Sequence, residues 1–166
     1  MGTRSRIGVM HGDKCKSVYC HWDGYLSHNG RILQEHYGSD QSPKANHLVA
    51  LGDISSLGEV IGKAHPFSEF GINKDDPDFD KLMALHDLAE KEGWTTFYAR
   101  DRGEKDVDFE VSHDFDEFLE LCDGTGAEYY YIMRDGVWYC GSLYSVEGMV
   151  PNTLYELSEQ LAKQNV

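Results

Sequence analysis

Two hairpin signals near opposite ends of the chain constrain its fold more than any other feature of the sequence. Asp135-Gly136 is the strongest kind of two-residue turn signal, and it separates two aromatic-rich segments. Gly12-Asp13-Lys14 separates two further segments that favour strands. The four strands are expected at residues 6–11, 17–22, 128–133 and 137–143. We expect the two hairpins to meet in one sheet, although the sequence does not define how they pair.

Helical patterns occupy much of the chain between the hairpins. The helices are expected at residues 29–37, 43–51, 79–92 and 115–122, with a last helix after Val150-Pro151. Asn29 is expected to be an N-cap, Pro43 a first helical residue, and Asp114 with Glu117 a capping box. Residues 95–99 and 107–111 favour short strands, and residues 53–78 are expected to be mostly loop. Because strands and helices do not alternate as βαβ units, we predict an α+β fold. We expect an antiparallel or mixed sheet built from the N- and C-terminal hairpins, with helices packed on it.

The chain length of 166 residues fits a single domain over residues 1–166. No apolar run approaches the roughly 20 residues of a membrane span, and the first residues lack the apolar stretch of a secretion signal. Four cysteines are few for this length, so we expect reduced, buried thiols. A cytoplasmic protein without membrane association is predicted.

Acidic residues are concentrated in the middle of the chain. Residues 75–123 hold 17 Asp and Glu against 5 Lys and Arg, within a chain whose formal charge is −14. Such a field repels phosphates, so direct nucleic-acid binding is not expected, whereas a basic protein surface would be attracted. The candidate partner-binding residues are Asp106, Asp108, Glu110, Asp116, Glu117 and Glu120. A surface that only confers solubility is the alternative.

An alternative ligand site is predicted near four other residues. His21 and Asp23 would share one side of a strand, where they could form an acid–base pair or simply bond to each other before a turn. Arg100 and Arg102 follow a predicted strand and could hold a phosphate or a carboxylate. A solvated turn with local ion pairs is the alternative for these two arginines.

Motifs for catalysis and cofactor binding are missing. The sequence has no Gly-x-Ser-x-Gly, no P-loop and no dinucleotide fingerprint. His21, His36, His47 and His65 lack the tight spacing of metal ligands. We therefore assign no catalytic residue, no metal and no cofactor, and we expect binding more than catalysis.

The chain resembles a group of small proteins encoded by tailed bacteriophages and prophages. The resemblance spans most of residues 1–145, and its most specific string is Tyr19-Cys20-His21-Trp22-Asp23-Gly24-Tyr25. Its other segments are Met1-Gly2-Thr3-Arg4-Ser5, Asn29-Gly30 with Leu33, His36 and Tyr37, residues 51–58, His65-Pro66-Phe67, residues 97–104, and residues 130–132 with Trp138-Tyr139. None of these motifs defines a chemistry.

What the resemblance implies is a setting, namely an accessory gene product inside an infected bacterium. By analogy, such a protein would bind and inhibit a host protein, for example a defence or nucleic-acid-processing enzyme with a basic groove. A small-ligand, nucleotide-binding or hydrolytic protein with the four-residue site is the alternative. A structural protein of the virion is the third hypothesis. Oligomeric state is left open.

Overall fold

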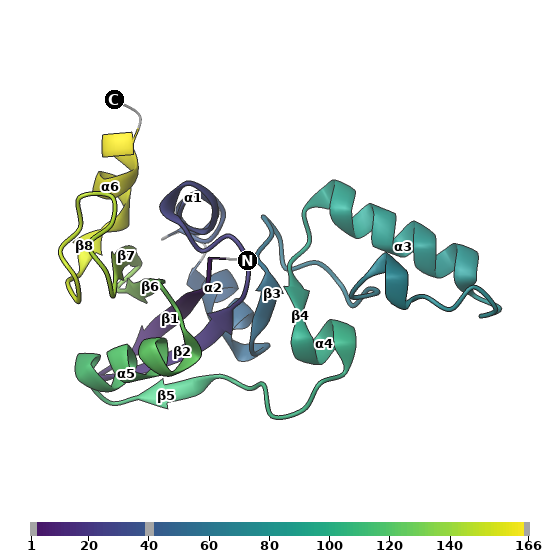
Figure 1. The fold of residues 1–166 in the computed structure, drawn as a ribbon, viewed down its shortest axis with the longest axis horizontal. Coiled ribbons are helices and arrows are strands. Elements are labelled where there is room, and N and C mark those ends of the chain that lie inside the picture. Colours follow the sequence, from purple (N-terminus) through teal and green to yellow (C-terminus); the bar gives the residue numbers. More distant parts are fainter. Residues whose placement is uncertain (1–2, 39–41, 165–166) are drawn as a thin grey trace.

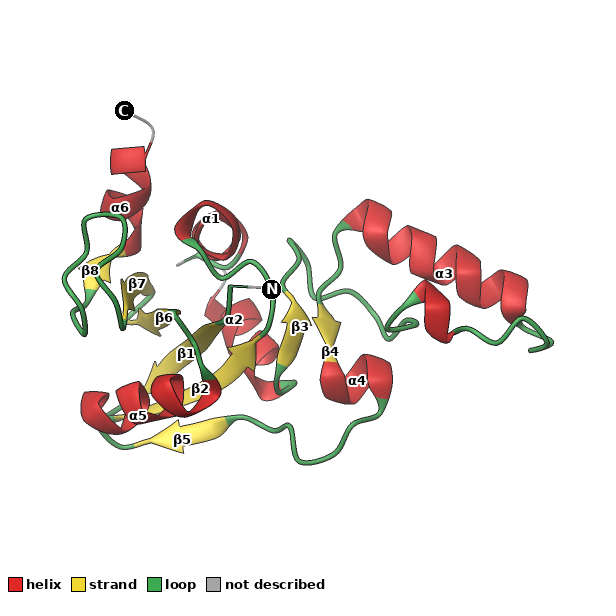
Figure 2. Cartoon of the chain, viewed as in Figure 1, coloured by secondary structure: helices red, strands yellow, loops and turns green. Residues whose placement is uncertain are grey.

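The fold is α+β, with helices packed around one mixed eight-stranded sheet, as Figures 1 and 2 show. The computed structural model describes residues 3–38 and 42–164. The strands are β1 (Ser5–His11), β2 (Lys14–Cys20), β3 (Ile54–Ser56), β4 (Thr96–Phe97), β5 (Glu110–Ser112), β6 (Tyr129–Arg134), β7 (Val137–Ser142) and β8 (Tyr155–Glu156). The helices are α1 (Arg31–His36), α2 (Ser42–Ala50), α3 (Phe79–Glu92), α4 (Tyr98–Arg102), α5 (Phe115–Thr125) and α6 (Leu157–Gln164). A π-helical turn, η1 (Leu26–Gly30), precedes α1, and a 3-10 turn, η3 (Glu69–Gly71), precedes α3.

Both expected hairpins form, and they meet at the centre of the sheet. The strand order is β4-β3-β2-β1-β6-β7-β8, and β5 also pairs with β2, next to β3 on the edge of β2 that faces away from β1. β1 and β6 pair in parallel, so that Ser5 lies opposite Tyr129 and Val9 opposite Met133. Asp135 and Gly136 both have positive φ, as the tight turn of this hairpin requires. The prediction that the two hairpins share one sheet is therefore confirmed.

The sheet is covered on both faces. Alternate residues of β1, β2 and β6, such as Ile7, Val18 and Tyr131, are buried under side chains of α1, α2 and α6. The opposite face carries a second apolar cluster, in which Tyr130 and Ile132 pack against Phe118 and Cys122 of α5. As a result α5 lies across one face of the sheet, and its outer side is left for solvent (Figure 1).

Asn29 does not cap a helix, contrary to the prediction. It is completely buried inside the helical segment, where its amide donates to Ser5 Oγ at 3.2 Å and to the carbonyl oxygen of Trp22 at 3.3 Å. Buried polar groups need such partners, so this side chain ties η1 to β1 and to the end of β2. Arg6 is also buried, and its Nε donates to Ser17 Oγ at 2.8 Å.

Several strand boundaries differ from the predicted ones, and Lys14, which was predicted to lie in the turn, begins β2, three residues before the predicted start of that strand. β2 ends at Cys20, so His21 and Trp22 continue as an irregular segment whose N–H groups donate to the carbonyls of Ile54 and Ser55. β3, inside the predicted loop, was missed. The strand predicted at residues 107–111 is a shorter strand shifted toward the C-terminus, β5.

One helix, α4, was not predicted, and another begins later than predicted. The strand predicted at residues 95–99 is only two residues long, because α4 begins at Tyr98. The last helix does not begin at Pro151 but at Leu157, because residues 155–156 first pair with β7 as β8.

The four thiols are all free and buried, as predicted. Burial raises the pKa of each of them, Cys15, Cys20, Cys122 and Cys140, to about 12. At neutral pH they are therefore protonated, and they behave as small apolar side chains. Within residues 3–38 and 42–164, no helix combines the length and apolar character that crossing a membrane requires.

Candidate functional site

The predicted acidic residues lie on two successive elements, the β5 segment and α5. Asp106, Asp108 and Glu110 are exposed on β5 and the segment before it, and Asp116 and Glu120 are exposed on α5. Asp114 begins α5, since its Oδ1 accepts a 2.8 Å hydrogen bond from the Glu117 N–H. This cap and the apolar contacts of Phe118 fix how α5 presents its outer carboxylates.

One side of α5 forms the wall of a groove. Asp116, Glu120 and Asp123 are spaced by about one helical turn, so they share a side of the helix. Together with Leu119 they line a hollow of about 330 Å³, whose opposite wall consists of Leu143, Tyr144 and Asn152. We call this hollow the α5 groove.

The opposite wall of the α5 groove is held by hydrogen bonds to one serine. Ser142 Oγ accepts from the Tyr144 N–H at 3.1 Å, and the Ser142 carbonyl accepts from the Asn152 N–H at 2.9 Å. Tyr144 is left 55% exposed. The groove therefore combines three carboxylates with an accessible aromatic ring.

The structure brings two of the six candidate carboxylates, Asp116 and Glu120, together in the α5 groove. Glu117 points elsewhere and lies 3.1 Å from His113 Nδ1. The three candidates of the β5 segment are not among the groove residues. Within the described part of the chain, Lys and Arg ion pairs with carboxylates are formed by Arg100 and Arg102 alone. None of the six candidate carboxylates is thus neutralised by a lysine or an arginine.

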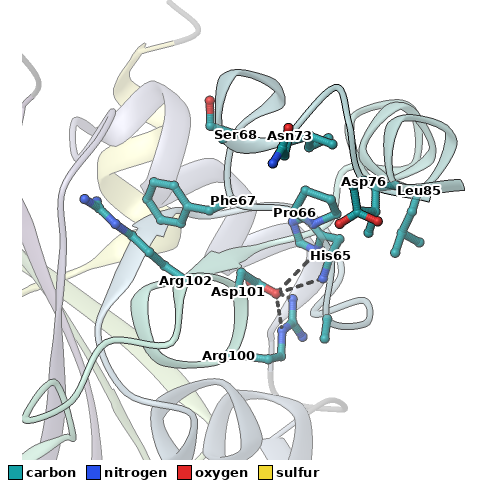
Figure 3. Close-up of a pocket in the computed structure, with 14 residues that line it drawn as sticks. His65, Pro66, Phe67, Ser68, Asn73, Asp76, Leu85, Arg100, Asp101 and Arg102 are labelled. Carbon is teal, nitrogen blue, oxygen red and sulfur yellow. Dashed lines mark hydrogen bonds and ion pairs between the residues drawn. The ribbon is translucent and has the colours of Figure 1, made fainter. Parts of the chain in front are cut away.

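A larger cavity, of about 840 Å³, lies beside α4, and Figure 3 shows it. The residues of α4 that line it are Arg100, Asp101 and Arg102. Its other walls are the segment 64–68, the segment 71–76, and Leu82 and Leu85 of α3. We call it the α4 cavity.

Asp101 is the centre of a buried network at the base of the α4 cavity. Its carboxylate is fully buried and accepts from the backbone N–H of His65 at 3.1 Å and of Phe97 at 2.8 Å. Arg100 donates to it from Nε at 3.0 Å and from Nη2 at 3.2 Å, and it also donates to the carbonyls of Gly62 and Thr95. This network joins three chain segments, so Asp101 and Arg100 stabilise the fold.

Arg102 is the accessible cation of the α4 cavity. Its side chain is 57% exposed, and its guanidinium carbon lies 5.0 Å from the centre of the Phe67 ring. Its Nε is 3.5 Å from a carboxylate oxygen of Glu104, which is a partly exposed and therefore weak pair. In Figure 3, Arg102 and Phe67 lie side by side, away from the Asp101 network.

His21 and Asp23 are not among the residues that line the α4 cavity, so the four residues of the alternative site do not form one cavity. His21 Nδ1 lies 2.6 Å from the hydroxyl of Tyr19, and partial burial followed by the charge of Arg4 lowers the pKa of His21. Asp23 instead accepts from the Tyr25 hydroxyl at 3.3 Å. The interpretation that His21 bonds to Asp23 is therefore wrong.

Sequence reasoning missed two residues that matter at these sites. Asp101 lies in the sequence between Arg100 and Arg102, the two arginines of the predicted ligand site. A carboxylate between two cations indicates a local ion pair, and this signal could have identified Asp101. Tyr144 gave no signal, because it follows the second strand of a hairpin and its exposure depends on the turn after β7.

Comparison with protein-family models, with curated proteins and with solved structures finds no match to this chain. Its resemblance to phage accessory proteins therefore stays a prediction from the sequence motifs.

Proposed function

We propose that this chain is a binding protein that docks onto a basic surface of another protein through the α5 groove. In the setting that the sequence motifs suggest, it is a phage accessory protein in the bacterial cytoplasm. Its partner is then a host protein with a basic, nucleic-acid-binding groove, and docking inhibits that protein. The observation that carries the proposal is a groove with three unneutralised carboxylates beside an exposed tyrosine ring.

The chemistry of the α5 groove suits an arginine or lysine side chain of a partner. A guanidinium can pair with Asp116 or Glu120 in a bidentate manner and stack on the ring of Tyr144. The partly buried side chains of Leu119 and Leu143 offer apolar surface for the aliphatic part of the same side chain. The groove therefore offers contacts both to the charged group of such a side chain and to its aliphatic part.

The charge of the surrounding surface supports the same partner class. Residues 75–123 have a formal charge of −12, and the β5 carboxylates extend the negative surface next to α5. Such a field accelerates encounter with a basic protein and weakens as salt is added. An acidic surface without any groove would steer a partner but would not orient it.

The test compares two charge-reversed variants of equal net charge. The variant Asp116→Lys/Glu120→Lys changes the α5 groove, and Glu69→Lys/Glu159→Lys changes two exposed carboxylates elsewhere. Wild type and both variants are tagged and used to capture proteins from lysed bacteria, and affinity for the protein captured in stoichiometric amount is then measured by calorimetry.

We expect wild type and the Glu69/Glu159 variant to bind alike and the Asp116/Glu120 variant to lose at least about tenfold in affinity. An activity assay of the captured protein then tests inhibition. Equal affinity of all three proteins would refute docking through the α5 groove. Capture of no protein would refute a host-protein partner.

A second candidate function, small-ligand binding, is favoured by the α4 cavity. Its volume is in the range of ligand sites, and Arg102 with Phe67 offers a cation next to an aromatic ring for an anionic, ring-containing compound such as a nucleotide. A ligand that binds the folded protein raises its unfolding temperature, and the increase grows with the ratio of ligand concentration to Kd. A nucleotide screen should therefore show a shift that Arg102→Ala removes, and a screen without any shift would refute this function.

A further inference from the structure

His86 is a buried histidine whose Nδ1 has no hydrogen-bond partner among the residues that the structure describes. It lies on α3, where 8% of its surface is exposed, and its Nδ1 is shut off from solvent without any hydrogen bond. A buried polar atom without a partner carries a free-energy cost, and each such atom requires an explanation. Apolar side chains of similar size would fill this position without that cost.

Two carboxylates approach the same imidazole. His86 Nδ1 lies 3.9 Å from Asp87 Oδ1, and His86 Nε2 lies 3.7 Å from Glu90 Oε1. One nitrogen of His86 and one oxygen each of Asp87 and Glu90 lie within 4.8 Å of one another. The two carboxylates approach different nitrogens of the ring, at distances too long for hydrogen bonds, and a single ion would bind one of these nitrogens together with both carboxylates.

We propose that His86, Asp87 and Glu90 bind a divalent first-row transition-metal ion such as Zn²⁺. Imidazole nitrogen and carboxylate oxygen are ligands that these ions share, with bonds of about 2.0–2.2 Å that place neighbouring ligand atoms roughly 3.3 Å apart. The present separations need only a small inward movement. Asp87 and Glu90 can make it, because their side chains are 70% and 72% exposed.

The spacing of the ligands follows from the geometry of α3. Glu90 is four residues after His86, which places both on one side of the helix. Successive helical residues do not face each other, so Asp87 reaches His86 through its side chain, with Oδ1 3.9 Å from Nδ1. Three protein ligands leave a tetrahedral ion with one further position, which water or a side chain of another protein can occupy. The site is on α3, at the end of the molecule away from the sheet and α5, as Figure 1 shows, so it is separate from the α5 groove.

The experiment is a titration of the metal-free full chain with Zn²⁺ by calorimetry and with Co²⁺ by visible absorption. We expect binding of one equivalent of Zn²⁺, a Co²⁺ absorption band typical of nitrogen and oxygen ligands, and a higher unfolding temperature with metal. Asp87→Asn and Glu90→Gln each change an exposed side chain, so folding is not at risk. Each should weaken the affinity by more than about tenfold and alter the Co²⁺ band.

His86→Ala should abolish the saturable binding, and circular dichroism checks that this variant is folded. Asp80→Asn is the matched control, since it removes an exposed carboxylate from the same helix without touching the site. It should leave the affinity unchanged. Two results would show nonspecific attraction of the metal to an acidic protein and would overturn the proposal. In the first, all the variants bind the metal with equal affinity. In the second, Asp80→Asn weakens the affinity as much as Glu90→Gln does. An absence of saturable binding would also overturn the proposal.

Discussion

The α5 groove and the α4 cavity both collect charged residues, but they use them in opposite ways. At the base of the α4 cavity, Asp101 is fully buried and bonded to Arg100 and to two backbone N–H groups. In the α5 groove, Asp116 and Glu120 are exposed and lack any lysine or arginine partner within the described residues. A charge that the fold has already paired stabilises the fold, whereas an unpaired and ordered charge is available to a partner.

This difference also explains why the larger hollow is not the better candidate for the main function. The α4 cavity is more than twice the volume of the α5 groove, at about 840 Å³ against about 330 Å³. Of its charged α4 residues, however, only Arg102 has an accessible charge, and Glu104 lies close to it. Available chemistry, more than volume, therefore distinguishes the two sites.

The largest effect is expected from Asp101→Ala. The change leaves the positive charge of Arg100 without its buried partner and removes the acceptor of the His65 and Phe97 N–H groups, so it should destabilise the protein by roughly 3–5 kcal/mol. Urea unfolding measures this directly. Glu104→Ala, which removes the partly exposed partner of Arg102, should cost at most about 1 kcal/mol. If Asp101→Ala lowered the free energy of unfolding by less than about 1 kcal/mol, the structural role of the network would be contradicted.

The second prediction compares one exposed aromatic residue from each region. Tyr144 lies in the α5 groove, and Phe70, which is 91% exposed, lies between the two segments that line the α4 cavity, 64–68 and 71–76. Tyr144→Ala should weaken partner binding by roughly tenfold, or about 1.4 kcal/mol, because it removes the stacking surface for a cation. Phe70→Ala should leave the affinity unchanged. The reverse result, measured by calorimetry, would move the docking surface to the cavity side.

The smallest effect concerns Asp53, a half-buried carboxylate close to the acidic surface. Burial raises its pKa, more than the hydrogen bond from the Tyr19 N–H and the charge of Arg6 lower it. The folded state therefore holds this proton more tightly than the unfolded chain does. The free energy of unfolding consequently falls as the pH rises from about 4 through the raised pKa.

Asp53→Asn removes this dependence and keeps an oxygen that can accept from Tyr19. Between about pH 4 and pH 7, wild type should lose more stability than the variant does, as urea unfolding at several pH values can show. Parallel curves for the two proteins would mean that Asp53 titrates as an ordinary carboxyl group.

Local chemistry explains which parts of the fold could be predicted. Asp135-Gly136 favours its turn through its own backbone preferences, and Asp114 caps α5 through a residue three positions away. The parallel pairing of β1 with β6 joins residues more than 100 positions apart, so no local pattern contains it. The same holds for Asn29, whose partners in β1 and near the end of β2 make it a buried tie and not a cap.

Tertiary contacts also account for the late start of α6. Pro151 would suit a first helical turn, but the segment after Pro151 instead packs closely against Gly141 of β7. Its lack of a side chain leaves room for the carbonyl oxygen of Thr153, which accepts a hydrogen bond from the Tyr130 hydroxyl. Residues 155–156 then pair with β7, and the helix begins after them. The wall of the α5 groove that carries Tyr144 depends on the same region, which is why the sequence did not reveal it.

The central claim, that the α5 groove is the docking surface, is tested most directly by amide hydrogen exchange on the complex with the captured partner. Exchange is compared peptide by peptide between the free and the bound protein. We predict slower exchange on binding in α5 and in residues 143–152, with little change in α4 and residues 64–76. Protection confined to α4 and residues 64–76 would contradict the account and would assign recognition to the α4 cavity.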